Sequence, residues 1–438
     1  MKKNITFIII ILNIIQILNI IVFPFQIKSK SKKNINDENE YYIYTNFEMG
    51  DPPQKINCEI NFDINDYFIT YSPLNVQPSY NDSLSKSFVK SSTNRITSSH
   101  FSGGFWGLEN FYFYTDLECK NKQKFESLNA VFPPKENKLS ACEIGLQPSH
   151  IFGKYQSIIH ILKSKQIVSN YIWTLKFKNL NEGILAIGSA PHEYNKINYK
   201  ENELIYTNGF SDNDKLYWCL YFKYSTINNN TMSQNIKMKI SPNIIGLIAT
   251  YDYLTSIEMI FFKKYYDKNI CEKEIISFDN NSYFKILCHK ELFNSKDIEQ
   301  FPPLYLYNIA FNYSFILNGK ELFIENNNDR IDFQILIEID STNTEWKLGR
   351  IFLSKYQIIF DDDNGVIGFY SSLPKVEVNN NKTRNLFLKI FILSLALIVF
   401  LFLFFLLYKK INILTKRKKL ANELEDNFIY IPRKNNGK

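Results

Sequence analysis

The sequence predicts a mostly β protein built from two similar halves and followed by a carboxyl-terminal transmembrane helix. Short runs of Tyr, Phe, Ile and Val fill the body and are separated by Asn, Asp, Gly and Pro, which is typical of strands and turns. Helical periodicity is confined to residues 156–164 and 257–266, at matching places in the two halves. A long segment without charge, residues 390–407, lies near the carboxyl end.

The strand candidates begin at Tyr41, directly after a polar and charged segment, residues 27–40. That composition predicts a flexible linker, because it offers little apolar surface to bury. Partial alternation of apolar and polar residues then predicts strands in six runs, namely residues 41–47, 110–114, 171–177, 217–224, 332–339 and 356–360.

The amino terminus has the pattern of a secretory leader. Lys2 and Lys3 precede residues 7–25, which are rich in Ile and carry no charge. A basic region followed by an apolar one is typical of a signal peptide, which we predict to cover residues 1–26. The apolar stretch is longer than the usual 7 to 15 or so residues. An uncleaved membrane anchor is therefore the alternative.

The carboxyl-terminal part has the pattern of a membrane anchor. Residues 376–389 form a polar stalk, and residues 390–408 are apolar over about the length that spans a bilayer. The tail, residues 409–438, holds nine Lys or Arg and three Asp or Glu. Basic flanks stay in the cytosol. We therefore expect a single-pass type I membrane protein with a lumenal or extracellular ectodomain and a cytosolic tail. A buried core helix is the alternative, but no comparable segment follows for it to pack against.

The charge and cysteine content agree with this topology. The net charge is +7, but the tail together with Lys2 and Lys3 accounts for it, so the body is near neutral. This distribution argues against nucleic-acid binding. Six cysteines fit an oxidising compartment. The body also contains five candidate glycosylation sites of the Asn-x-Ser/Thr type, at Asn81, Asn229, Asn280, Asn312 and Asn381.

Two segments at opposite ends of the body carry a family resemblance. Gly50-Asp51-Pro52-Pro53-Gln54 follows the first strand candidate, and its two prolines fix φ and end strand pairing. Near the other end stands Trp346-Lys347-Leu348-Gly349-Arg350, followed by Phe352-Leu353, Tyr356, Phe360-Asp361 and Ile367-Gly368-Phe369. These segments resemble the G-x-P-P-Q turn and the W-x-L-G-D-x-F-L to I-G-F region of the pepsin-like aspartic proteases.

Further segments resemble that family in the same order along the chain, namely residues 80–88, 102–107, 142–146, 184–189, 217–218 and 301–304. The resemblance implies a bilobal pepsin-like fold, with an amino-terminal lobe at residues 41–190 and a carboxyl-terminal lobe at residues 191–375. It also implies a disulfide between Cys271 and Cys288. Cys58, Cys119, Cys142 and Cys219 do not match the family's usual pairs, so three pairings remain open.

The family cleaves peptides with two aspartates, one from each lobe, which share one proton because two adjacent like charges cannot both ionise. Counting from the Pro-Pro-Gln turn puts the first aspartate position at Asn61, and aligning the segment around Leu254 puts the second at Ile248. Neither residue can do this chemistry. The resemblance therefore implies a non-catalytic homologue whose ectodomain binds an extended peptide or a protein.

The alternative is an active membrane-bound aspartic endopeptidase with an atypical dyad. A shift in alignment would place Asp63 and Asp252 at the two catalytic positions. Both shifts would be needed together, and neither supplies the glycine that the turn requires, because Asn65 and Leu254 stand there.

No other chemistry is indicated. His100, His150, His160, His192 and His289 show no metal-binding spacing, so we predict no metal site. The sequence has no glycine-rich phosphate loop, and we predict no cofactor.

Overall fold

The computed structural model describes residues 20–29, 41–64, 67–69, 80–91, 103–133, 142–148, 157–209, 217–227, 230–278, 281–326, 329–339, 345–371, 411–420 and 422. The chain divides into two compact units, Met1–Leu373 and Pro374–Lys438. All described strands lie in the first unit. In the second unit, residues 411–420 are helical.

The first sheet has 13 strands, in the order β11-β24-β23-β9-β10-β1-β6-β2-β3-β8-β4, with β5 and β7 paired to β6. These strands are β1 (Ile21–Ser29), β2 (Tyr41–Met49), β3 (Gln54–Asn61), β4 (Tyr67–Ile69), β5 (Val89–Lys90), β6 (Phe105–Tyr114), β7 (Lys122–Phe132), β8 (Cys142–Gly145), β9 (Ile172–Asn179), β10 (Glu182–Ile187), β11 (Leu204–Asn208), β23 (Ile358–Asp361) and β24 (Val366–Tyr370).

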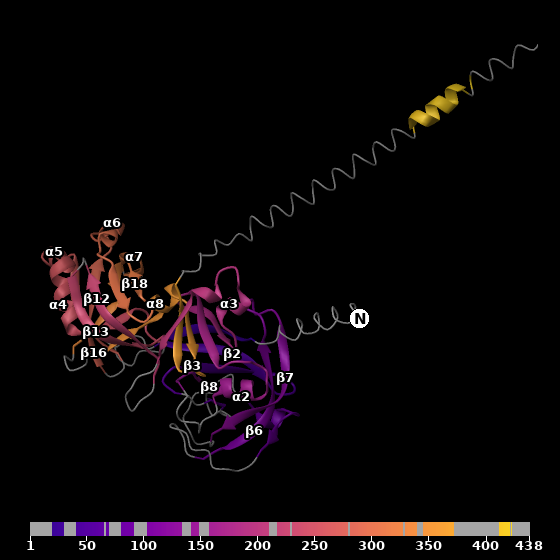
Figure 1. Cartoon of the computed structure of the whole chain (residues 1–438), viewed down its shortest axis with the longest axis horizontal. Helices are drawn as coiled ribbons and strands as arrows, with labels where there is room; N and C mark the ends of the chain where they lie inside the picture. Colours follow the sequence, from indigo (N-terminus) through magenta and orange to yellow (C-terminus); the bar gives the residue numbers. More distant parts are fainter. Residues whose placement is uncertain are drawn as a thin grey trace, which may run out of the picture. The chain divides into compact units, whose positions relative to one another are not determined.

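The second sheet has 11 strands, in the order β18-β17-β12-β13-β22-β14-β21-β16-β20-β19, with β15 paired to β16. Its strands are β12 (Cys219–Ile227), β13 (Asn230–Ile240), β14 (Leu247–Ala249), β15 (Cys271–Phe278), β16 (Asn281–His289), β17 (Leu304–Asn308), β18 (Tyr313–Leu317), β19 (Phe323–Glu325), β20 (Arg330–Phe333), β21 (Ile335–Glu338) and β22 (Trp346–Leu348). Within the first unit, the elements labelled β12, β13, β16 and β18 group on one side, and β2, β3, β6, β7 and β8 on the other (Figure 1).

The helices are short. They are η2 (Asp82–Leu84), α2 (Ile158–Ser164), α3 (Pro191–Tyr194), η3 (Glu201–Glu203), α4 (Tyr251–Ile257), η4 (Glu258–Phe262), α5 (Lys263–Tyr266), α6 (Ser295–Glu299), α7 (Gly319–Leu322) and α8 (Arg350–Lys355). The helix predicted at residues 156–164 is confirmed by α2. The one predicted at residues 257–266 is confirmed as well, but it begins earlier, because α4, η4 and α5 follow one another without a break.

The strands follow the alternation of the sequence. In β2, Ile43, Thr45, Phe47 and Met49 are buried and their neighbours are half-buried, as expected for a strand with one face on the core. An aromatic cluster joins the two halves of the chain. The ring of Trp173 in β9 stacks on Phe360 in β23, with centroids 3.8 Å apart, and Trp218 meets both rings edge-on. The two halves therefore share one apolar core.

The sequence-based start of the fold is wrong. The first strand begins at Ile21 and not at Tyr41, so it includes residues 27–29 of the predicted linker, and the rest of that segment, residues 30–40, lies outside the described residues. Alternation could not reveal β1, because its first residues are apolar without interruption and continue the leader pattern. A continuous apolar run of this kind suits a strand that is covered on both faces.

Candidate functional site

The first loop of the candidate site follows β3 and starts at Asn61, the last residue of that strand. β3 runs parallel to β8, with Asn61 opposite Gly145, and β4 runs antiparallel to β8, with Phe68 opposite Glu143. Residues 61–64 therefore form a loop that leaves one side of β8 and returns on the other. The disulfide between Cys58 and Cys142 links β3 to β8. The loop is thus anchored by strand pairing and by a covalent bond.

The amide of Asn61 is engaged at both ends. Its Nδ2 donates to Glu143 Oε1 at 2.6 Å, and its Oδ1 accepts from the backbone N–H of Asp63 at 2.8 Å. The carbonyl of Asn61 also accepts from Leu146 N at 2.8 Å. An amide has no proton that it can exchange near neutral pH, so Asn61 holds the loop but cannot act as a general acid or base.

The second half of the chain repeats this topology. β13 runs parallel to β22, with Ile240 opposite Leu348, so that Ser241 and Gly349 come next. β14 runs antiparallel to β22, with Leu247 opposite Leu348 and Ile248 opposite Lys347. Ser241 N donates to Leu348 O at 2.8 Å. β22 therefore corresponds to β8, β13 to β3, and β14 to β4.

This correspondence identifies the second equivalent position as Ser241. In the first half, Asn61 lies opposite Gly145, and the residue seven positions later, Phe68, lies in the returning strand. In the second half, Ser241 precedes Ile248 by the same seven positions. Ile248 is therefore the counterpart of Phe68 and not of Asn61.

The sequence-based assignment of Ile248 to the dyad is thus corrected. Ile248 is fully buried in β14 and packs in a cluster with Ile244, Ile276 and Tyr283. The sequence-based assignment depends on aligning Leu254-Thr255 and the helix predicted after them, whereas the strand register is set by β22. Ser241-Pro242-Asn243 gives no local sign of the family turn, so only the strand pairing reveals it.

Glycines allow the second loop, residues 241–246 between β13 and β14, to pack tightly. A Cβ on Gly349 would come within 2.1 Å of Gly246 O, and a Cβ on Gly246 would come within 1.6 Å of Gln334 O. Both contacts are shorter than real side-chain contacts, so the backbone approach requires glycine at each position. This explains the glycine of the Trp-x-Leu-Gly segment.

The alternative dyad is not formed. The Asp63 carboxylate makes an ion pair with Lys239, and Asp252 lies exposed in the first turn of α4. No hydrogen bond or ion pair joins Asp63 to Asp252, both of which the structure describes. The structure thus brings Asp63 to a lysine of β13 and not to a second carboxyl group.

A group of charged side chains surrounds this ion pair. We call Asp63, Tyr217, Lys237, Lys239 and Glu345 the lysine cluster. The Nζ atoms of Lys237 and Lys239 lie 4.7 and 5.3 Å from the centroid of the Tyr217 ring. Tyr217 OH donates to Glu345, and Lys237 Nζ lies 3.7 Å from Glu345 Oε1. The only sign of it in the sequence is the alternation of Lys237 and Lys239 along β13.

Two further residues, Trp218 and Arg350, hold the halves together near these loops. Trp218 Nε1 donates to Leu146 O at 2.8 Å. The fully buried Arg350 donates to Leu180 O at 2.8 Å and to Ile244 O at 3.3 Å, and its guanidinium lies over the ring of Tyr41. Burial lowers the pKa of Arg350 to about 10. Arg350 thus links the β9–β10 turn to the second loop.

A buried carboxylate lies elsewhere in the first sheet. Glu109 of β6 is fully buried and accepts hydrogen bonds from Tyr80 OH, Ser87 Oγ and, at 2.7 Å, Asn110 N. Burial and the neighbouring carboxylate raise the pKa of Tyr80. These bonds satisfy the charge within the fold, so Glu109 acts as a structural residue.

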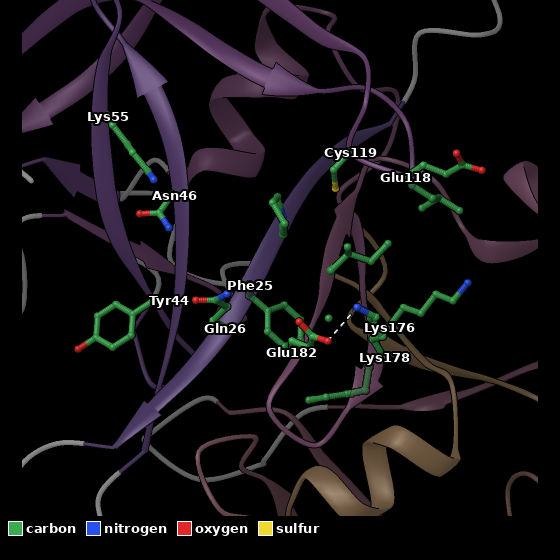
Figure 2. Close-up of a pocket in the computed structure, with 15 residues that line it drawn as sticks. Phe25, Gln26, Tyr44, Asn46, Lys55, Glu118, Cys119, Lys176, Lys178 and Glu182 are labelled. Carbon is green, nitrogen blue, oxygen red and sulfur yellow. Dashed lines mark ion pairs between the residues drawn. The ribbon is translucent and has the colours of Figure 1, made fainter.

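A pocket of about 640 Å³ lies apart from both loops. Phe25 and Gln26 of β1 line the middle of its wall (Figure 2). Tyr44, Asn46 and Lys55 line it on one side of them, and Cys119, Lys176 and Glu182 on the other. Lys178 pairs with Glu182 at 2.9 Å. Neither Asn61 nor Ser241 lines it.

Four of the six cysteines form two disulfides. The disulfide between Cys271 and Cys288 is confirmed. The open pairing resolves to Cys58 with Cys142, and Cys119 and Cys219 stay outside both disulfides. Burial, followed by the charge of Asp116, raises the pKa of the Cys119 thiol to about 11. In the described part of the chain, no group of three or more His, Cys, Asp or Glu could hold a metal ion.

The glycosylation and membrane predictions fall largely outside the described residues. Asn312 is exposed, and its Oδ1 accepts from Tyr307 OH at 3.0 Å. Asn81 is half-buried, and its Oδ1 caps the turn at η2. Asn229, Asn280 and Asn381 lie outside the described residues, as do the predicted stalk and the predicted span at residues 390–408. Among the residues that are described, no helix is long and apolar enough to cross a membrane.

The chain resembles known proteins in its fold but not in its sequence. No protein-family model matches the chain, and no curated protein matches its sequence. Among solved structures, the chain is similar to basic 7S globulin from soybean, with a TM-score of 0.58 and 14% identity over 81% of this chain and 96% of that one. It is also similar to conglutin gamma, a basic 7S globulin from lupine seeds, with a TM-score of 0.56 and 11% identity over 81% and 95% of the two chains. The chain therefore has a mostly β, bilobal fold with two sheets, similar to that of the basic 7S globulins.

Proposed function

We propose that this protein is a non-catalytic homologue of the pepsin-like aspartic proteases. One observation carries the proposal: the two equivalent loop positions hold Asn61 and Ser241, so neither loop presents a carboxyl group there. Peptide hydrolysis on this fold depends on two carboxyl groups that share a proton. Asp63, the nearest carboxylate in the first loop, is neutralised by Lys239.

An acid-pH cleavage assay tests this proposal. The full chain, purified in detergent, is incubated with a quenched fluorescent peptide library between about pH 3 and about pH 7, with and without pepstatin, and with pepsin as the positive control. We expect no pepstatin-sensitive cleavage. The proposal would be overturned by cleavage that pepstatin blocks, provided that Asp63→Asn or Asp252→Asn abolishes it. The control variant Asp267→Asn should then keep that cleavage.

The ectodomain is proposed to bind an extended peptide or a protein. The lysine cluster supports this idea, because it places two lysines, two carboxylates and an aromatic ring near the loops that begin at Asn61 and Ser241. These are the positions where we infer that the protease family carries its catalytic aspartates. Such a mixture recognises peptides by charge and shape without cleaving them.

Selection from a random decapeptide library measures this binding. The immobilised full chain is expected to enrich a defined set of peptides. The Lys237→Ala/Lys239→Ala variant should lose that set, whereas Lys223→Ala, at an exposed position of β12, should keep it. If no peptides are enriched, or if the double variant enriches the same peptides, the lysine cluster does not bind them.

The protein is also proposed to be a type I membrane protein, with the span at residues 390–408 and the tail in the cytosol. The uncharged segment and the basic flank after it support this topology. Alkaline extraction should leave the full chain in the membrane and release a chain that ends at residue 389. Protease added to intact cells should remove the ectodomain and spare the tail, and the opposite pattern would reverse the topology.

A further inference from the structure

The first strand overlaps the predicted leader. β1 covers Ile21–Ser29, whereas the sequence pattern places the end of the signal peptide at residue 26. Removal of residues 1–26 would therefore take away two thirds of a strand. The burial and pairing of this strand decide whether the fold tolerates that loss.

β1 lies inside the first sheet and not at its edge. It pairs with β10 from Ile21 to Gln26, with β2 from Phe25 to Ser29, and with β6 at Val22. Without residues 21–26, β10 would lose this partner along its whole length, and β2 would lose it at Tyr44 and Thr45. Backbone groups left unpaired in a buried region cost as much as lost hydrogen bonds.

The side chains of β1 are part of the core. Ile21, Val22, Phe23 and Phe25 are each at most 2% exposed. The ring of Phe23 lies 5.2 Å from that of Phe113, and the ring of Phe25 lies 5.4 Å from that of Phe177. Losing four such side chains would leave a cavity, which destabilises in proportion to its volume.

The carbonyl of Pro24 also satisfies a buried hydroxyl. Thr45 Oγ1, on the fully buried Thr45 of β2, donates to Pro24 O at 2.8 Å. Without β1, this hydroxyl would lose the partner that balances its burial. Phe25 and Gln26 also line the pocket of Figure 2, opposite Tyr44, so the pocket would lose part of its wall.

The leader itself offers no suitable cleavage site within this strand or before it. Signal peptides are cut after small residues, in an Ala-x-Ala-like pattern. Residues 7–20 contain only Phe, Ile, Leu, Asn and Gln, and the nearest small pair in that spacing is Ser29, the last residue of β1, and Ser31. A cut at that pair would remove the whole strand.

We propose that β1 is a permanent part of the mature protein, so that no processing of the leader takes place on the carboxyl side of Ile21. The apolar leader core then ends near Asn19, which brings its length within the usual 7 to 15 or so residues. The long apolar run is thus two consecutive elements: a targeting segment and a core strand.

The mature amino terminus tests this directly. The full chain is purified from the cells that make it, and its terminus is determined by sequencing and by the mass of its first peptide. We expect the peptide that contains Ile21 to Lys28, whether it starts at Met1 or later. A terminus anywhere between residues 22 and 41 overturns the proposal.

A matched pair of substitutions gives an independent readout. Phe23→Asp places a charge at a fully buried position of β1, whereas Gln26→Asp places it at an exposed position of the same strand. If β1 is retained, Phe23→Asp should reduce the amount of folded, protease-resistant ectodomain at least about tenfold, and Gln26→Asp should leave it unchanged. Equal amounts of folded protein from both variants would mean that β1 is absent from the mature fold.

Discussion

Asp63 in the first loop and Lys239 on β13 of the second sheet form an ion pair that joins the two halves of the chain. Lys239 stands two positions before Ser241, and Asp63 two positions after Asn61. The pair therefore lies close in sequence to both of the equivalent loop positions, Asn61 and Ser241. It puts a positive charge next to the Asp63 carboxylate, which is the reverse of what a proton-sharing pair of carboxyl groups needs.

This ion pair is expected to add little stability. The Lys239 side chain is 22% exposed and that of Asp63 is 54% exposed. Exposed pairs contribute about 0–1 kcal/mol because water and salt screen them. A double-mutant cycle with Asp63→Asn and Lys239→Met should give a coupling energy below about 1 kcal/mol, measured by urea unfolding. A coupling several times larger would show that water does not reach the pair.

Asn61→Asp is expected to destabilise the protein at neutral pH and much less at acidic pH. The new carboxyl would replace an amide that donates to Glu143 at 2.6 Å, so two carboxylates would face each other. Repulsion raises the folded-state pKa of the new acid above its unfolded value of about 3.9. Below its raised pKa the new acid is neutral in the folded protein and does not repel Glu143. As the pH rises through that pKa, the folded protein must carry the second charge, and its stability falls. The variant should therefore lose about 2 kcal/mol against wild type at about pH 7 and little at about pH 4. A deficit that does not change with pH would contradict this.

The assignment of Ser241 has a test of its own. If Ser241 is the counterpart of Asn61, the double variant Asn61→Asp/Ser241→Asp brings two new carboxyl groups together, and its loss of stability at about pH 7 should exceed the sum of the single losses by about 1 kcal/mol or more. The control is Asn61→Asp/Ile248→Asp. Ile248 is fully buried in β14, so its replacement should be strongly destabilising by itself. Additive losses in the Ser241 double variant would contradict the assignment.

Arg350→Lys is expected to destabilise the protein by about 2 kcal/mol, since hydrogen bonds from charged groups contribute about 1.5–3 kcal/mol each and a lysine cannot reach two carbonyls in the guanidinium geometry. The acceptors at risk are Leu180 O and Ile244 O. Arg330→Lys, at a partly exposed site, should change the stability little. Thermal unfolding of the three proteins measures the difference, and equal midpoints for Arg350→Lys and wild type would show that Arg350 does not hold the two segments together.

The two disulfides should differ in their effect. Cys58 and Cys142 are 84 positions apart, and Cys271 and Cys288 are 17 apart. In the chain-entropy model, removing them costs about 4–5 and about 3 kcal/mol respectively. Unfolding of Cys58→Ala/Cys142→Ala and of Cys271→Ala/Cys288→Ala compares the two. Mass spectrometry of unreduced peptides verifies the pairing, and a bond from Cys58 to any other cysteine would contradict the structure.

Much of the fold was predictable from local sequence. The prolines after β2 and the helix α2 are set by residues close together in the chain. The Trp-x-Leu-Gly segment before α8 and the disulfide from Cys271 to Cys288 were implied by the family resemblance. The assignment of Asn61 to the first aspartate position rests on a short count without a gap from the Pro-Pro-Gln turn, and it stays a prediction.

The sequence by itself therefore determined a mostly β body with its strand and turn segments in order. Only the tertiary structure decided that β1 belongs to the sheet, that Cys58 pairs with Cys142, and that Ser241 and not Ile248 is the counterpart of Asn61. These three outcomes depend on which strands lie side by side. An apolar run such as Ile21 to Phe23 looks the same in a leader as in a core strand, and strand register is set by partners far away in the chain.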